Sequence, residues 1–367
     1  MRICVPLWLT LSVLAAACGE DGGTDADGGP DAAVTGDGAS SNGAGRRDGS
    51  SPDGAVDRRD AAPPDGATEL RDAGIRDAVL PDVGPGGTDG PRLKAAWPQR
   101  SARFGAAVAV DAVVVAGAPA ASGCGQGVSP PQMNGCTFSG EAYVFSRGGG
   151  LEARLKSSVT GERDAFGAAV AAHGEYVFVG APREDGCPGD AAGNACPDSG
   201  AVHVFSSSAE GWSPATRLAP SGEASEARFG SALAARDGKL VVGAPEAEDC
   251  GGEDCRDAGA VYVFEARDDP GLERAEWVQT ATLTDPDPID GARFGAAVAL
   301  GRDRTGGDVI VVGAPDDPRC SADDGVGGCT QAGAAHVFVR TSTTWVHAAT
   351  LRAEVPTSFE LFGFAVA

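Results

Sequence analysis

Short apolar runs separated by polar turns recur in the same order along residues 91–367. In one copy, the first run covers residues 166–171, the Val-rich second run 176–181, the alternating third run 201–205 and the fourth run 212–218. Runs of this length bounded by Gly and Pro predict β-strands, and no helical periodicity lies between them. The pattern therefore predicts an all-β chain built from units of four short strands.

Two sequence markers define the period of this pattern. Phe-Gly pairs recur every 62 to 68 residues, at Phe104-Gly105, Phe166-Gly167, Phe229-Gly230, Phe294-Gly295 and Phe362-Gly363. Gly-Ala-Pro tripeptides end the second run at Pro119, Pro182, Pro245 and Pro315, because proline has no N–H to donate to a strand ladder. Markers in a fixed order indicate a repeat architecture, and four-stranded antiparallel repeats indicate the blades of a β-propeller.

The repeats divide the region into four complete units and one partial unit. We place them at about 103–155, 165–218, 228–283 and 293–351, with the partial unit at 361–367. A Leu lies 11 residues before each Phe-Gly pair, and the earliest, Leu93, predicts a fourth strand ahead of the first complete unit. The last residues predict a first strand of another blade. We therefore expect four complete blades plus a partial blade, as in a truncated ring.

The repeat resembles the FG-GAP repeat of the integrin α-chain β-propeller, in its compact bacterial form. The residues that carry the resemblance are Phe166-Gly167 with Val170-Ala171, then Gly180-Ala181-Pro182, then the strand ending at Phe205 and the strand from Trp212 to Leu218. The resemblance covers about residues 91–367. It implies a propeller with an extracellular binding role, and it does not specify a ligand.

The repeated residues are expected to pack rather than to react. Each Phe is predicted at an interface between blades, and the Gly beside it leaves room for a neighbouring backbone or a tight strand start. Trp212, Trp277 and Trp345 recur in register in the fourth run, which favours packing over ligand stacking. The near-continuous Val-rich runs are typical of strands that are buried on both faces.

The first 17 residues predict a secretion signal. Arg2 precedes an apolar run from Val5 to Ala17 that is too short to cross a bilayer as a helix. Small residues before Cys18 resemble a bacterial lipoprotein box, which makes Cys18 the candidate for lipidation and membrane anchoring. Plain cleavage and an uncleaved anchor are the alternatives. We expect a protein of the bacterial cell envelope, at the outer membrane or cell surface.

Residues 18–90 predict a disordered tether. Asp, Gly, Ala and Pro dominate this segment, which has no aromatic residue and no apolar periodicity. Such a composition cannot bury enough apolar surface to offset the chain entropy. The whole chain has a formal net charge of −23, and no basic cluster follows the tether. We therefore expect no nucleic-acid partner, since binding to phosphates needs a basic surface.

Eight cysteines fall into four local pairs between a Gly-Ala-Pro tripeptide and the following third run. The pairs are Cys124–Cys136, Cys187–Cys196, Cys250–Cys255 and Cys320–Cys329. One pair at the same loop of each repeat, in a secreted chain, predicts four disulfides. Zinc is the alternative, but no His accompanies the pairs.

The same second-to-third-strand loops carry clustered acids, including Asp185, Glu246, Glu248, Asp316 and Asp317. Loops on a rigid scaffold are common binding sites, so we expect a protein or glycan ligand to contact this rim. The alternative is that the acids are simply solvated surface.

We expect no cofactor and no metal. Calcium needs six to eight oxygen ligands, and the turns between first and second runs are short and poor in acids. The longest contains Asp303 and Asp308, a weak calcium candidate because two Arg accompany them. We also expect no catalytic residue, because the four His match no catalytic motif.

Together these features favour a secreted, lipid-anchored propeller that binds protein or glycan without catalysis. Two other functions remain open from sequence alone. One is an accessory or catalytic propeller of an extracellular enzyme whose active part lies outside this chain, and the other is a structural envelope protein.

Overall fold

The computed structural model describes residues 92–123, 136–157, 159, 161–186, 196–220, 225–248, 256–267, 274–319 and 329–367. The chain divides into two units, Met1–Asp72 and Ala73–Ala367, and the described residues all belong to the second. The predicted signal, Cys18 and the tether therefore lie outside them. Within the described ranges, no helix has the length and apolarity needed to cross a bilayer.

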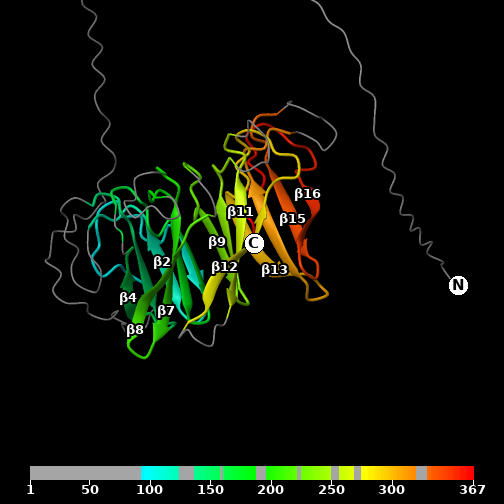
Figure 1. The fold of residues 1–367 in the computed structure, drawn as a ribbon. Coiled ribbons are helices and arrows are strands. Elements are labelled where there is room, and N and C mark those ends of the chain that lie inside the picture. The colour runs from blue at the N-terminus through cyan, green and yellow to red at the C-terminus, as the bar shows by residue number, and fades with distance from the viewer. Residues whose placement is uncertain are drawn as a thin grey trace, which may run out of the picture. The chain divides into compact units, whose positions relative to one another are not determined.

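The described residues form four antiparallel sheets of four strands, each in chain order (Figure 1). Sheet 1 contains β1 (Val108–Val110), β2 (Val114–Ala118), β3 (Glu141–Phe145) and β4 (Leu151–Leu155). Sheet 2 contains β5 (Ala169–His173), β6 (Tyr176–Ala181), β7 (Ala201–Ser208) and β8 (Gly211–Leu218). Sheet 3 contains β9 (Ala232–Arg236), β10 (Lys239–Ala244), β11 (Ala260–Arg267) and β12 (Glu276–Leu283). Sheet 4 contains β13 (Ala297–Arg302), β14 (Asp308–Ala314), β15 (Ala334–Arg340) and β16 (Trp345–Leu351).

The predicted all-β architecture is confirmed, and so are four strands per repeat. Successive sheets meet through their first strands, since β1 contacts β5, β5 contacts β9 and β9 contacts β13. Phe166, Phe229 and Phe294 are fully buried, each in an apolar cluster that it shares with residues of the preceding sheet. Face-to-face packing of successive four-stranded sheets is the arrangement of propeller blades.

The Phe-Gly pair lies just before the first strand rather than within it, which corrects the predicted strand start. Phe166 makes a parallel bridge to Gly140 of the preceding sheet, and Gly167 has a φ of +90°. Only glycine adopts this backbone conformation without strain. The pair therefore turns the chain into the new sheet, and β5 begins two residues later at Ala169.

The Gly of each Gly-Ala-Pro tripeptide faces the Phe-Gly glycine of the following sheet. A Cβ added to Gly180 would overlap the carbonyl oxygen of Gly230, and the same relation joins Gly117 to Gly167. Within one sheet, the Gly167 N–H donates to the Gly180 carbonyl at 2.8 Å. Glycines thus connect the sheets in series through alternating hydrogen bonds and close backbone contacts.

Both partial elements at the ends of the series differ from expectation. Residues 92–100 contain no strand, although Leu93 packs against the apolar cluster of sheet 1. Phe362 pairs with Gly333 as an isolated bridge, and no strand follows it. A strand needs a ladder partner, and neither segment has one in the described residues. In the described residues, no sheet covers the face of sheet 1 that points away from sheet 2. Val108 is therefore 66% exposed, whereas its counterpart Val170 in sheet 2 is 7% exposed.

Candidate functional site

The second-to-third-strand loops leave one end of the sheets, and we call this end the loop rim. A hydrogen bond closes the neck of each loop, from the Gly that precedes the third strand to the carbonyl four residues after the Gly of Gly-Ala-Pro. The acceptors are Ala121, Glu184, Ala247 and Asp317, each at 2.9 Å. The four loops therefore leave the scaffold with the same neck geometry, although their lengths and sequences differ.

The predicted disulfides lie partly outside the described residues. Cys136, Cys196 and Cys329 are disulfide-bonded, while Cys124, Cys187, Cys320 and both Cys250 and Cys255 fall outside the described ranges. The pairing within each repeat stays a prediction.

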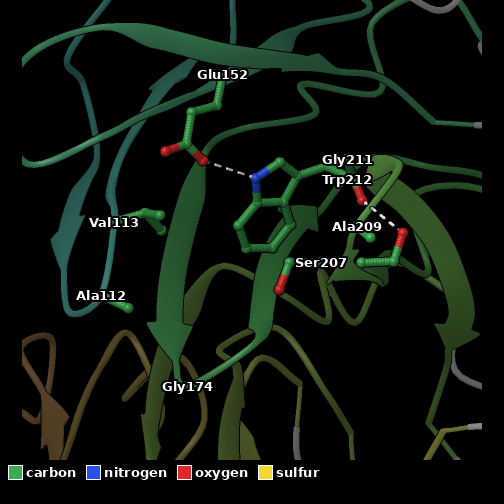
Figure 2. Close-up of a pocket in the computed structure, with 9 residues that line it drawn as sticks. Ala112, Val113, Glu152, Gly174, Ser207, Ala209, Gly211 and Trp212 are labelled. Atoms are coloured by element: carbon green, nitrogen blue, oxygen red, sulfur yellow. Dashed lines mark hydrogen bonds between the residues drawn. The ribbon is translucent and has the colours of Figure 1, made fainter.

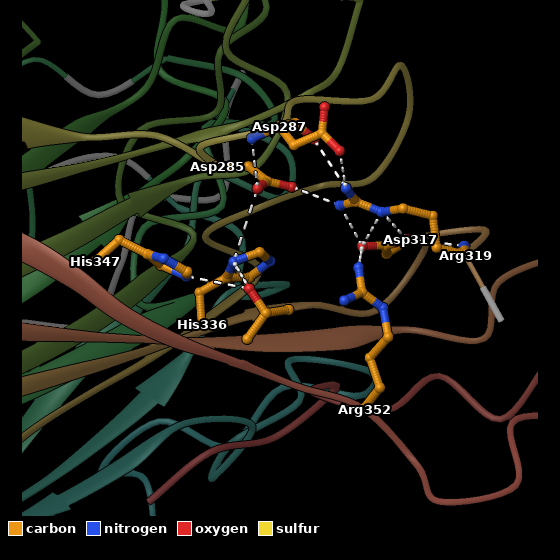
Figure 3. Close-up of polar contacts among 8 residues, drawn as sticks. Asp285, Asp287, Asp317, Arg319, His336, His347 and Arg352 are labelled. Atoms are coloured by element: carbon orange, nitrogen blue, oxygen red, sulfur yellow. Dashed lines mark hydrogen bonds and ion pairs between the residues drawn. The ribbon is translucent and has the colours of Figure 1, made fainter. Parts of the chain in front are cut away.

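A buried ionic network supports the neck of the sheet 4 loop (Figure 3). The Arg319 guanidinium bonds Asp317 at 2.6 Å, Asp285 at 2.8 Å and Asp287 at 2.8 Å. Arg352, at the end of the fourth strand, bonds the same Asp317 oxygen at 2.7 Å. Burial alone would raise the pKa of Asp317, but the hydrogen bonds and charge of Arg319 hold it below its usual value. Asp285 and Asp287 follow β12, so the network joins sheet 3 to sheet 4.

His336 of β15 lies against this network. Its Nδ1 is 3.7 Å from Asp285 and 3.3 Å from the Thr350 hydroxyl. Burial lowers the pKa of His336 to about 4, so the ring is neutral at pH 7. Asp285, Asp317 and His336 place ligand-type atoms within 4.8 Å of one another, a set that could hold a transition metal. However, the Arg319 guanidinium already bonds both carboxylates, so a cationic side chain of the protein neutralises their negative charge.

Sheet 2 contains a related cluster at the same repeat positions. Glu184, the counterpart of Asp317, bonds His203 at 2.6 Å and Arg217 at 2.6 Å. Burial would raise the pKa of Glu184, but these two partners hold it below its usual value. His203 and His336 occupy the position of Tyr143 and Tyr262 on the third strand. A sheet with His at this position of the third strand therefore has a carboxylate residue at the neck position, and a sheet with Tyr there has Ala at the neck position.

Sheet 1 contains a third buried polar cluster, which is made of different residues. Glu141 of β3 accepts from the Tyr143 hydroxyl at 2.6 Å and from Arg154 at 2.7 Å, and all three side chains are buried. Every buried carboxylate of these three clusters therefore has a cationic or hydroxyl partner. Their common role is to hold the scaffold under the loops.

Acids at the loop rim also connect neighbouring sheets. Glu246 of sheet 3 lies 2.8 Å from Arg228 and 3.8 Å from Arg293. Arg293, just before sheet 4, also lies 3.3 Å from Asp316. Burial raises the pKa of Glu246. Other rim acids, such as Glu248 and Asp257, are exposed.

The weak calcium candidates make protein contacts. Asp303 accepts from the Thr305 and Gly307 backbone N–H groups at 2.8 Å each, which closes the turn between β13 and β14. Asp308 lies 3.1 Å from Lys239 of the preceding sheet. These contacts give both carboxylates a structural role, and the absence of calcium stays a prediction.

A cavity of about 420 Å³ lies at the opposite end of the sheets from the loop rim (Figure 2). It is lined by Ala112, Val113, Glu152, Gly174, Ser207, Ser208, Ala209, Gly211 and Trp212. Sheet 1 supplies the first three residues, and sheet 2 supplies the rest. The Trp212 indole donates to Glu152 at 3.0 Å. This site was not predicted, because the recurrence of Trp212 in register favoured packing over ligand stacking.

The four packed sheets and their repeated turns place the chain among the β-propellers. The FG-GAP repeat family matches three consecutive stretches, residues 150–205, 212–264 and 277–338. The chain therefore contains FG-GAP repeats, and its four-stranded sheets are consistent with the blades of an FG-GAP β-propeller. None of the curated proteins matches it. The fold itself does not name a ligand, which must come from the sites.

The matched stretches are offset from the sheets by one strand. Residues 150–205 begin with β4 of sheet 1 and end within β7 of sheet 2, and the next two stretches have the same relation to their sheets. One FG-GAP repeat thus supplies the last strand of one sheet and the first three strands of the next.

Proposed function

We propose that this protein is a secreted, lipid-anchored β-propeller of the bacterial cell envelope, which acts as a non-catalytic binding or adhesion module for a protein or glycan. The leader with Cys18, the long acidic tether and the FG-GAP repeats support this function. The tether would separate the propeller from the membrane. Its polar composition is suited to that role because it gains little from folding.

The single observation that carries the proposal is the construction of the loop rim. All four described necks close with the same 2.9 Å hydrogen bond, and buried ion pairs support the necks of sheets 2 and 4. Beyond the necks, the loops vary in length and carry exposed acids such as Glu248. Variable loops on a rigid base are a common design for binding surfaces.

The buried polar groups argue against a catalytic site among the described residues. A catalytic base needs access to a substrate, but Glu184 and Asp317 are buried and bonded to Arg217 and Arg319. An enzyme accessory role and a structural envelope role are the competing functions. Saturable binding to a defined partner would separate the proposed function from the structural one.

Reversal of charge at the loop rim is expected to weaken partner binding by roughly fivefold to tenfold, because rim charges guide complementary surfaces together. The oxidised wild-type protein would be screened on arrays of purified glycans and envelope proteins, and affinities would be compared for Glu248→Lys. Glu276→Lys is the matched control, since Glu276 is also exposed but starts β12 at the opposite end. Absence of saturable binding, or equal loss in both variants, would contradict a binding rim.

Cys18→Ser is expected to abolish incorporation of labelled palmitate when the full chain is expressed in a bacterial host, because the thiol accepts the lipid. Cys4→Ser is the control, since Cys4 lies inside the predicted leader and its loss should leave labelling intact. Membrane fractionation would show whether lipid-free protein is released. Equal labelling of wild type and Cys18→Ser would exclude the lipoprotein assignment.

A further inference from the structure

The cavity beside Trp212 differs from the equivalent space at the next interface between sheets at two positions. Val113 lies four residues before the Gly of Gly-Ala-Pro, and its counterpart in sheet 2 is Tyr176. Tyr176 packs edge-on against Trp277 with ring centroids 5.5 Å apart, and Trp277 is only 7% exposed. Val113 lacks an aromatic ring, so the equivalent space beside Trp212 remains open and Trp212 is half-buried.

The second difference from the next interface is Glu152, which makes the cavity polar on one side. Its counterpart in sheet 2 is Ala215, three residues before the Leu that ends the fourth strand. The indole Nε1 of Trp212 donates to Glu152 at 3.0 Å. In the described residues, the Nε1 atoms of Trp277 and Trp345 are buried without a hydrogen-bond partner. Trp212 is thus held by a polar group while its surroundings are left accessible.

We propose that this cavity binds a pyranose ring of a neutral saccharide, stacked against the Trp212 indole. A pyranose has an apolar C–H face that suits the electron-rich face of an aromatic ring, and hydroxyls at its edge that suit the Glu152 carboxylate and Ser207. Glu152 can accept further hydrogen bonds because a carboxylate has about four lone-pair sites and the indole uses one. Gly174 and Gly211 add no side chains to the lining.

The charge and size of the cavity narrow the ligand class. An anionic ligand would be repelled by Glu152 and by a chain of net charge −23. The volume of about 420 Å³ is in the range of small-molecule sites. A cationic amine is the strongest competing ligand, since cations also bind over an indole face. The cavity lies at the opposite end from the loop rim, so this proposal can fail while the loop-rim proposal stands.

The test uses the variant Val113→Tyr, which places a tyrosine ring beside Trp212 as Tyr176 lies beside Trp277 at the next interface. The folded, oxidised protein is screened on an array of terminal hexoses, N-acetylhexosamines and deoxyhexoses, and the methyl glycoside of the best hit is titrated by calorimetry. We expect saturable binding that Val113→Tyr weakens at least tenfold and Glu152→Gln weakens severalfold. The Tyr176–Trp277 pair of the next interface shows that this repeat accommodates the added ring, and circular dichroism confirms folding of the variant.

Glu248→Lys at the loop rim is the matched control and should leave saccharide binding unchanged. Choline chloride is titrated in parallel as the cationic probe. Three results would overturn the proposal: no saturable binding to any saccharide of the array, equal binding by wild type and Val113→Tyr, or binding of choline in place of the sugar.

Discussion

Replacement of Gly180 by alanine is expected to lower the free energy of unfolding by about 4 kcal/mol or more, the largest effect among the changes considered, and to prevent accumulation of folded protein. The new Cβ would overlap the backbone carbonyl oxygen of Gly230 in the next sheet. A backbone cannot move aside as a flexible side chain does, so relief would require the two sheets to separate. Urea unfolding followed by circular dichroism would measure the loss, with soluble yield as a second readout.

Gly301→Ala is the matched control for this prediction. Gly301 also lies in a strand, β13, but a Cβ added there meets nothing within 4 Å. Alanine should therefore leave stability unchanged or raise it by about 0.5 kcal/mol, since it restricts the unfolded chain more than glycine does. If Gly180→Ala proved as stable as Gly301→Ala, the close backbone contact between sheets would not exist in solution.

Asp317→Ala is expected to destabilise the fold by about 3 kcal/mol. Asp317 is fully buried and bonds both Arg319 and Arg352. Its removal would leave two largely buried guanidinium groups short of a partner, which costs more than the intact pair contributes. The midpoint and slope of urea unfolding at pH 7 would give the difference in free energy.

Asp287→Ala separates the effect of burial from the loss of an Arg319 contact. Asp287 also bonds Arg319 at 2.8 Å, but its side chain is 85% exposed. Exposed ion pairs contribute about 0–1 kcal/mol, so this variant should unfold close to wild type. A similar loss in both variants would show that the network contributes through the number of its contacts rather than through the burial of Asp317.

The fold could be predicted from sequence because its signal repeats. Val-rich runs that end at Pro182 and Pro245 mark β6 and β10 correctly. The strand start at Phe166-Gly167 was wrong because the sequence pattern does not show backbone dihedrals, and a φ of +90° at Gly167 excludes a strand there. The strand predicted at Leu93 was wrong for a different reason, since apolar residues alone provide no ladder partner.

The sites were less predictable because they join positions far apart in the chain. Alignment of the repeats places His203 and His336 with Tyr143 and Tyr262, yet the accompanying carboxylates Glu184 and Asp317 were not paired with them. That signal was present, at a fixed distance after each Gly-Ala-Pro. The cavity beside Trp212 was harder to find, since it depends on the absence of a ring at Val113, which lies 99 residues earlier.

The one-strand offset between FG-GAP repeats and sheets has a consequence for how such a chain changes length. An isolated repeat contains three strands of one sheet plus one strand that pairs only within the neighbouring sheet. That strand would be unpaired, so the repeat would be a poor folding unit by itself. In tandem, however, inserting or deleting one whole unit within the series leaves every junction with the same pairing as before. The architecture therefore permits gain or loss of modules by recombination without redesign of the contacts between them.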